Sequence, residues 1–307
     1  MSAAGKGRRD GDRRYPPAIA PTLPYPVKAA VTRARSALWL ARTRKHLAIS
    51  GLRILLYHRV ADDRDELAVP VRRFRDQMEL LASQGYRVVD VLAAAELLAG
   101  GAEPTDKTIG LSFDDGFRDV AEHALPMLEQ HGFRATVFVA TGVIDRTASF
   151  TWYRRQPPLL SWDEIRELDA EPTLSFEAHT VTHPNLLAVD DMRARAEVFD
   201  SKTTLEDRLG RRVTAFCYPA GLFGERDRRL VAEAGFRIAV SCEPGVNLPE
   251  TDRLALRRRQ IDARDSLLDF RAKISGGHDT PLPLRGLYRR LRYGEDTERP
   301  ARASSRV

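Results

Sequence analysis

The feature that most constrains this chain is a regular alternation of short apolar runs with segments of helical spacing, extending over about 220 residues from Leu52. Runs such as residues 53–57 and 135–140 have the length and composition of buried parallel strands. Between them, segments such as residues 72–84 place apolar side chains at helical spacing. Parallel strands joined by helices build either an open sheet or a closed barrel. Further strands are predicted at 108–113, 174–178, 215–218, 236–240 and 254–261, and further helices at 118–130, 162–168 (with Ser161 as N-cap), 190–209 and 225–234.

Glycine-rich nucleotide motifs are absent from the ends of these runs. No G-x-G-x-x-G follows a predicted strand, and no P-loop spacing occurs. These motifs are typical of open sheets that bind dinucleotides or nucleotide phosphates. The sequence therefore favours a barrel within the α/β class.

The two ends of the chain differ in composition from the part between them. Residues 1–26 contain five prolines among Gly and Arg, and residues 278–307 are rich in Arg and Pro, so both are expected to be disordered or extended tails. The predicted domain between them, residues 51–277, is long enough to bury a substantial core. The net charge of +6 comes largely from these ends. Solvated tails explain it, because no basic motif interleaved with aromatic residues predicts nucleic-acid binding.

Residues 27–50 are predicted to form a basic amphipathic helix. Val27, Val31, Ala34 and Leu38 fall on one stripe, with Lys28, Arg35, Arg42 and Lys45 around it. Such a helix suits peripheral contact with an anionic membrane surface. It is equally compatible with a helix whose apolar stripe is docked on the main domain. The sequence leaves both interpretations open.

Cysteine content and hydropathy indicate the cellular compartment in which the protein is expected. The two cysteines, Cys217 and Cys242, lie in short apolar runs and are expected to pack as small core residues without a disulfide framework. Neither an apolar secretory signal nor an 18-residue apolar run is found. A cytoplasmic location is expected, with membrane association through residues 27–49 as an option.

Polar clusters follow four of the predicted strands. They are Tyr57-His58, Asp114-Asp115-Gly116, His179-Thr-Val-Thr-His183 and Tyr218-Pro219-Ala220-Gly221. In a barrel of parallel strands, the carboxyl ends of the strands meet at one face, where catalytic residues gather. The four clusters therefore predict a single site.

The paired histidines and paired aspartates together predict a metal site. Imidazoles four residues apart can converge on one ion, although two surface histidines also occur at this spacing by chance. Adjacent carboxylates after an apolar strand, Asp114 and Asp115, repel each other and are costly to bury, so a divalent cation is a natural partner. An acidic pair at a helix N-terminus is the alternative. A glycosidase pair is disfavoured because adjacent residues cannot flank a sugar ring.

Two of these clusters resemble motifs of a known family. Leu111-Ser-Phe-Asp-Asp-Gly-Phe117 and His179-Thr-Val-Thr-His-Pro184 are similar to the first two motifs of the polysaccharide deacetylases, also called the NodB homology domain or carbohydrate esterase family 4. Ile54-Leu-Leu-Tyr-His58 and Phe216-Cys-Tyr-Pro-Ala-Gly221 resemble the branch that includes biofilm poly-N-acetylglucosamine deacetylases. The likeness covers residues 52–275. It implies a distorted (β/α)7 barrel that hydrolyses N-acetyl or O-acetyl groups of glycans, and hence a hydrolase of carbon–nitrogen bonds other than peptide bonds.

The resemblance also implies roles for individual residues. Asp115, His179 and His183 match the metal ligands, and Asp114 matches the catalytic base. Zn²⁺ is the expected ion, and Co²⁺, Ni²⁺ or Fe²⁺ suit the same donors. The backbone N–H of Tyr218 is expected to stabilise the oxyanion, with Pro219 fixing the loop.

Two departures from the family pattern affect the remaining roles. The third motif lacks its arginine, and no late Leu-x-His motif supplies an acid; His278 lies in a stretch expected to be a terminal loop. His58 is the expected acid, unless it is a strand-end histidine bonded to backbone. Arg258 is expected to pair with Asp114, unless its basic run is merely solvated. Trp162 matches a family position, and packing at its helix start explains it equally well.

The expected function is deacetylation of an acetylated sugar or polysaccharide. Two alternatives remain at this point: an inactive glycan-binding or assembly protein on the same fold, and a deacylase of a small molecule or lipid-linked sugar.

Overall fold

A computed structural model describes residues 24–42, 51–100 and 107–279 of the chain. Seven parallel strands form the wall of a barrel in the order β10-β1-β5-β6-β7-β8-β9, and β4 pairs with the outer edge of β5. The strands are β1 (Arg53–Tyr57), β4 (Arg87–Val89), β5 (Thr108–Asp114), β6 (Ala135–Val139), β7 (Leu174–Ala178), β8 (Ala215–Cys217), β9 (Ile238–Val240) and β10 (Arg258–Gln260).

The ring of strands is nearly closed between β9 and β10. Ser241 N–H donates to Leu256 O at 2.8 Å, and Arg258 N–H donates to Glu243 O at 3.0 Å. Val240 also forms a parallel bridge with Leu256. The fold is therefore the distorted (β/α)7 barrel that the family resemblance implied.

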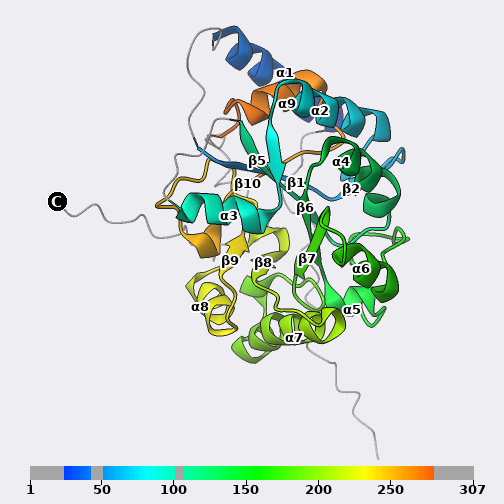
Figure 1. Ribbon diagram of the computed structural model, residues 1–307, viewed down its shortest axis with the longest axis vertical. Coiled ribbons are helices and arrows are strands. Elements are labelled where there is room, and N and C mark those ends of the chain that lie inside the picture. Colours follow the sequence, from blue (N-terminus) through cyan, green and yellow to red (C-terminus); the bar gives the residue numbers. More distant parts are fainter. Residues whose placement is uncertain (1–23, 43–50, 101–106, 280–307) are drawn as a thin grey trace, which may run out of the picture.

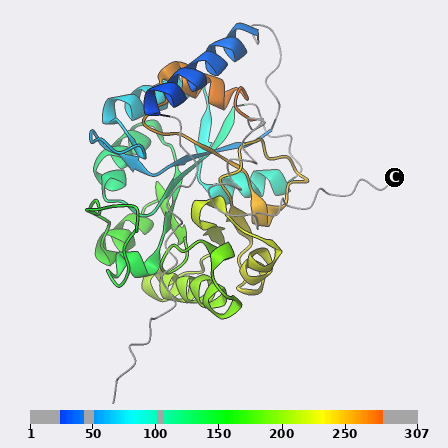
Figure 2. The same ribbon diagram turned by 180° about the vertical axis from the view of Figure 1, so that it is seen from behind.

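Helices surround the barrel, as Figures 1 and 2 show from opposite sides. Their apolar faces and the outer faces of the strands form the main core, which includes Phe74, Leu128, Ile165 and Val198. The helices are α1 (Tyr25–Arg42), α2 (Val71–Ser83), α3 (Val91–Ala99), α4 (Leu125–His131), α5 (Thr141–Ile144), α6 (Trp162–Asp169), α7 (Asp191–Leu209), α8 (Glu225–Glu233) and α9 (Leu267–Ile274). Short elements complete the chain: β2 (Arg59–Val60), β3 (Ala68–Val69), η1 (Val120–Ala124), η2 (Leu186–Ala188), η3 (Pro219–Gly221) and η4 (Arg253–Ala255).

A second apolar cluster fills the barrel. It joins Ile54, Phe138, Cys217 and Val240 from different strands, and residues of α3 pack against it. Because the strand interior is filled with side chains, the barrel is a packed core and not a pore. Polar chemistry is thereby confined to the ends of the strands.

Most predicted elements are present within two or three residues of their expected bounds. The helix predicted at 118–130 is the main exception, because it is a π-helical turn, η1, followed by α4. Pro126, at the start of α4, has no N–H to donate to the preceding turn, which interrupts the regular helix there. Ser161 caps α6 in a full capping box with Glu164, as predicted for the N-cap.

Two predicted boundaries differ from the structure at the ends of the domain. The basic helix predicted at 27–50 is observed as Tyr25–Arg42, and residues 43–50 lie outside the described residues. The predicted tails, 1–26 and 278–307, also fall almost entirely outside them. His278 and Asp279 lie in the turn after α9, as expected for a loop, but both side chains are buried. Among the helices in residues 24–42, 51–100 and 107–279, none has the length and apolar character needed to cross a bilayer.

Candidate active site

The four polar clusters meet at the carboxyl ends of β1, β5, β7 and β8, as expected from parallel strands. The chain bends sharply at the end of β5, where Asp115 and Gly116 both adopt positive φ, 78° and 73°. A Cβ on Gly116 would lie 2.8 Å from the Val139 side chain, so only glycine fits this bend without a shift. The bend places the side chains of Asp114 and Asp115 in the same buried region.

Asp115 lies between the two histidines of the second cluster. Its Oδ1 is 3.6 Å from His179 Nε2 and 3.7 Å from His183 Nε2. Neither carboxylate oxygen has a hydrogen-bond partner among the described residues, although the side chain is almost wholly buried. Burial, together with the charge of Asp114, raises the pKa of Asp115 well above its ordinary value. A buried, unpartnered carboxylate needs a compensating charge.

The spacing of the three side chains suits a metal ion. Nitrogen and oxygen ligands about 2.1 Å from a tetrahedral cation lie about 3.4 Å from one another. The Asp115, His179 and His183 donor atoms all lie within 4.8 Å of one another, which is close to this arrangement. Burial lowers the pKa of His179 to about 4 and that of His183 well below 6.5, so both imidazoles are neutral and can act as ligands. The residues present therefore fit a divalent cation.

The histidines are held in place by a loop and not by a helical turn. Thr180 and His183 both have positive φ, and Glu197 of α7 accepts hydrogen bonds from the backbone N–H groups of Val181 and Thr182. The Nδ1 of His179 lies 2.7 Å from Cys217 O. A proton on Nδ1 would make this hydrogen bond and leave the Nε2 lone pair directed at the site.

Asp114 is bound to a buried arginine that comes from the opposite end of the sequence. Arg258 Nη1 donates to Asp114 Oδ1 at 2.7 Å, and Arg258 Nη2 donates to Asp114 Oδ2 at 2.8 Å. Arg258 also donates to Ser241 O at 2.9 Å and Ser112 Oγ at 3.1 Å. Although burial raises the pKa of Asp114, the arginine charge and hydrogen bonds outweigh it and hold the pKa below its ordinary value. The predicted pairing of Arg258 with Asp114 is thus present.

Cys217 is a site neighbour that the sequence did not identify. It is wholly buried, as predicted, but its Sγ lies 3.0 Å from Arg258 Nη2, 3.5 Å from Asp114 Oδ2 and 3.8 Å from His179 Nε2. Burial raises the pKa of its thiol well above the ordinary value, so the sulfur stays protonated. A cysteine in an apolar run carries no sequence signal for this position.

His58 lies at the end of β1 near the same aspartate. Its Nδ1 is buried and has no hydrogen-bond partner among the described residues, so no backbone bond through Nδ1 explains it. Burial lowers its pKa, the Asp114 charge opposes this, and the Arg258 charge adds to it. The imidazole is therefore neutral near pH 7.

The third cluster is arranged differently from the prediction. The backbone N–H of Tyr218 donates to Val240 O at 3.2 Å, which continues the β8–β9 hydrogen bonding. Its ring is buried and its hydroxyl donates to Leu254 O at 3.0 Å. The prediction that Tyr218 N–H serves an oxyanion is wrong, because that amide is used by the sheet. Pro219 begins the buried turn η3, in which Ala220 has a φ of 53°.

Aromatic side chains of the segment before α6 border the histidines, a contact that the sequence did not indicate. The Phe150 and Trp152 rings contact His183 edge-on, with centroids 5.5 and 4.9 Å away. Trp162 is partnered elsewhere, since its Nε1–H donates to Asp145 at 2.7 Å and the Arg208 guanidinium lies over its ring. These contacts support the packing interpretation of Trp162.

Comparison with known proteins agrees with this geometry. Residues 101–239 match the family model described as polysaccharide deacetylase. YxkH of Bacillus subtilis (strain 168), a protein named for the same family, is 27% identical over 210 residues, which are 68% of this chain and 71% of that protein.

Solved structures show the same barrel. IcaB from Ammonifex degensii superposes with a TM-score of 0.61 at 25% identity, covering 71% of this chain and 94% of that one. The Streptococcus pyogenes deacetylase PplD, solved with acetate, gives a TM-score of 0.64 at 23% identity over 73% of this chain and 98% of its own. Residues 101–239 thus match a polysaccharide deacetylase domain, and this similarity indicates a hydrolase acting on amide bonds.

Proposed function

We propose that this protein removes acetyl groups from the amino groups of an N-acetylated sugar or glycan with the help of a divalent cation, with Zn²⁺ as the expected ion. The observation that carries the proposal is the buried Asp115 carboxylate, unpartnered among the described residues, with two neutral imidazoles at 3.6 and 3.7 Å. Three protein ligands leave positions open for water and substrate. When bound, the cation supplies Lewis acidity to the attacking water and the acetyl carbonyl.

Asp114 accepts the proton of the attacking water in this mechanism. Its pKa lies below the ordinary value, so the carboxylate is ionised and can accept a proton, although as a weak base it would need the Lewis acidity that a cation held by Asp115, His179 and His183 would supply. Arg258 acts as a positioning residue, because its two donors fix both carboxylate oxygens and keep the group ionised at neutral pH.

His58 delivers a proton to the leaving amine. Its pKa is lowered by burial, so the neutral imidazole first takes up a proton and then donates it as the carbon–nitrogen bond breaks.

The backbone amide that stabilises the oxyanion is proposed to lie in the turn after β8 and to belong to a residue other than Tyr218. In that turn Gly221 N–H donates to Tyr218 O at 2.8 Å and Leu222 N–H donates to Pro219 O at 3.0 Å. The Ala220 N–H between them, on a residue in a left-handed conformation, is the donor we propose.

The direct test is deacetylation by the full chain after metal removal and reconstitution. We expect primary amine and acetate to appear in equal amounts from N-acetylglucosamine oligomers with Zn²⁺, Co²⁺, Ni²⁺ or Fe²⁺, and none after chelation. Acetate without amine from an O-acetylated glycan would assign ester hydrolysis instead. Binding of oligomers without product under every metal would replace the proposal with an inactive glycan-binding protein.

A further inference from the structure

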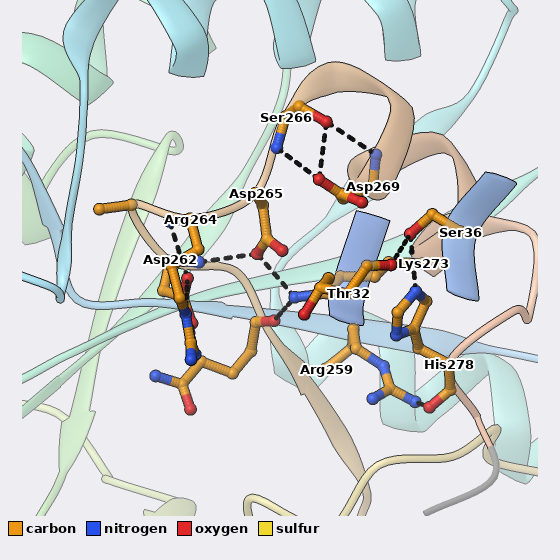
Figure 3. Close-up of polar contacts among 12 residues, drawn as sticks. Thr32, Ser36, Arg259, Asp262, Arg264, Asp265, Ser266, Asp269, Lys273 and His278 are labelled. Carbon is orange, nitrogen blue, oxygen red and sulfur yellow. Dashed lines mark hydrogen bonds and ion pairs between the residues drawn. The ribbon is translucent and has the colours of Figure 1, made fainter. Parts of the chain in front are cut away.

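Helix α1 is docked on the domain through its polar face. It packs along α9 at one end of the molecule, as both ribbon views show. The one wholly buried side chain of its described residues is Ser36, whose hydroxyl donates to Thr32 O at 2.8 Å. With that hydrogen used, the Ser36 oxygen accepts from His278 Nε2 at 2.9 Å (Figure 3). A serine–histidine contact, and not an apolar seam, lies at the centre of the interface.

Further polar contacts fix the rotation of the helix. Arg33 Nε donates to Asp269 Oδ2 at 2.9 Å, Arg35 Nε donates to Gly277 O at 3.1 Å, and Trp39 Nε1 donates to Ser275 Oγ at 3.2 Å. Three contacts spread over two turns leave the helix no freedom to turn about its axis without breaking them. The orientation of the opposite face is therefore set by the domain.

That opposite face is apolar and exposed. The predicted stripe of Val27, Val31, Ala34 and Leu38 points to solvent, with exposed fractions of 43% for Val27, 45% for Val31 and 52% for Leu38. Of the seven large hydrophobic side chains exposed in the described part of the chain, four lie on α1 and Leu268 lies on α9 beside it. At 3.6 residues per turn, the stripe is continued by alanines, all exposed: Ala30, Ala37 and Ala41.

Cations border the apolar stripe, and α1 contains no acidic residue. Lys28, Arg35 and Arg42 lie along one side by helical spacing, and Arg33 lies on the other. Lys28 has a distant and exposed acidic partner, Glu66 at 3.9 Å, whereas Arg33 is paired with Asp269 of the domain. An apolar stripe between rows of cations is the pattern of a helix that lies in the plane of a lipid interface.

We propose that α1 is a preformed docking helix that seats this protein on an anionic lipid surface. The apolar stripe enters the headgroup boundary, and the side chains of Lys28 and Arg42 extend beside it to the phosphates. A second copy of the chain fits less well, because two such stripes packed together would bring basic side chains to one boundary without an acid on either helix. The proposal is independent of the deacetylase assignment, since lipid binding is measured without any glycan.

The experiment is sedimentation of the full chain with vesicles. We expect it to bind phosphatidylcholine–phosphatidylglycerol vesicles at least about tenfold more tightly than pure phosphatidylcholine, and less tightly as salt is raised. The double variant Val31→Glu with Leu38→Glu should lower that binding by about tenfold or more. Both side chains are about half exposed, so folding is preserved, and circular dichroism with thermal unfolding checks this.

Matched variants distinguish vesicle binding through α1 from vesicle binding through other parts of the basic chain. Met192→Glu, at an exposed apolar position of α7, should leave vesicle binding unchanged. Arg42→Glu should weaken binding to the anionic vesicles only. Equal vesicle binding by the Val31/Leu38 variant and the unaltered chain would overturn the proposal. A lipid-free dimer that this variant dissociates would assign the stripe to self-association instead.

Discussion

At the scale of single residues, the proposed mechanism divides the site into groups that would hold a cation and groups that would move protons. Asp115, His179 and His183 share one buried region, whereas Asp114 faces Arg258 on its other side. Adjacent aspartates thus have opposite electrostatic environments, because burial raises the pKa of Asp115 while the arginine lowers that of Asp114.

The division predicts that Asp114→Asn loses activity but keeps its metal. The amide cannot accept the proton, so kcat should fall by about 10²- to 10⁴-fold. Asp115 and both histidines are untouched, so metal content measured by mass spectrometry should stay near that of the unaltered protein. Loss of metal together with activity would show that the base and ligand roles are misassigned.

His58→Ala tests the proton donor. We expect a fall in kcat of about 10²-fold or more with metal content and KM little changed, because the imidazole acts only as the amine departs. An acetate ester with a phenolate leaving group needs no such proton, so its hydrolysis should fall much less. Equal losses on amide and ester would argue against His58 as the acid.

Local patterns, Asp-Asp-Gly after a strand and two histidines four apart, together with the family resemblance, predicted that Asp115, His179 and His183 lie together, and the structure brings their donor atoms within 4.8 Å of one another. The Arg258–Asp114 pair, 144 residues apart, could be named only through resemblance, and its geometry needed the closed barrel. Cys217 and Trp152 were missed because neither residue type signals a site by itself. Tyr218 was misassigned since no pattern reveals which amide the β8–β9 pairing uses.

At the scale of elements, prediction succeeded where periodicity was strong. The 19-residue helix α7 and the seven-residue strand β5 were both expected. The three-residue strand β4 and the nine-residue, alanine-rich helix α3 were not predicted, because such short segments contain too few repeats of the strand or helix periodicity. The docking face of α1 could not be predicted either. An amphipathic pattern indicates which face is apolar, but not that a buried Ser36–His278 contact turns this face outward.

The contact at His278 predicts that α1 docking weakens in acid. Burial, reinforced by the charges of Lys273, Arg35 and Arg259 and opposed by Asp269, lowers the pKa of His278 to about 3. An undocked His278 would titrate near its ordinary value of about 6.5, so the undocked state binds more protons below that pH. Docking is therefore fully stable above about pH 6.5 and loses stability as the pH falls toward 3.

Hydrogen exchange of α1 peptides measures this directly. After correction for intrinsic rates, exchange in α1 should rise between pH 7 and pH 5, while that of α7 stays protected. The variant His278→Gln, which can still donate to Ser36 but does not titrate, should show a flatter pH dependence. Identical pH profiles for both proteins would assign the effect to other groups, such as Asp269.

At the scale of the whole molecule, the proposed metal site holds a buried carboxylate with neither oxygen hydrogen-bonded among the described residues. Buried aspartates elsewhere are hydrogen-bonded: Asp227 accepts from Gly224 N–H at 2.9 Å and pairs with Arg226. Asp115 alone among the buried aspartates described has both oxygens without partners. The barrel should accordingly be more stable with a cation than without it, since a ligand that binds only the folded state stabilises it by mass action.

The effect of Asp115→Asn on the melting temperature should therefore have opposite signs in the metal-free and the metal-bound protein. Without metal, Asp115→Asn should raise the melting temperature by several degrees, because it replaces a costly buried carboxylate with an amide and one kcal/mol corresponds to about 2–4 °C in a domain of this size. With Zn²⁺ present, the unaltered protein should gain stability and the variant should not, so the order reverses. Asp227→Asn provides the control and should lower the melting temperature in both states, because its carboxylate is fully bonded. Calorimetry on the unaltered chain and the two variants, each with and without Zn²⁺, measures all six values. A metal-free Asp115→Asn protein less stable than the unaltered chain would contradict the assignment of Asp115 as an uncompensated ligand.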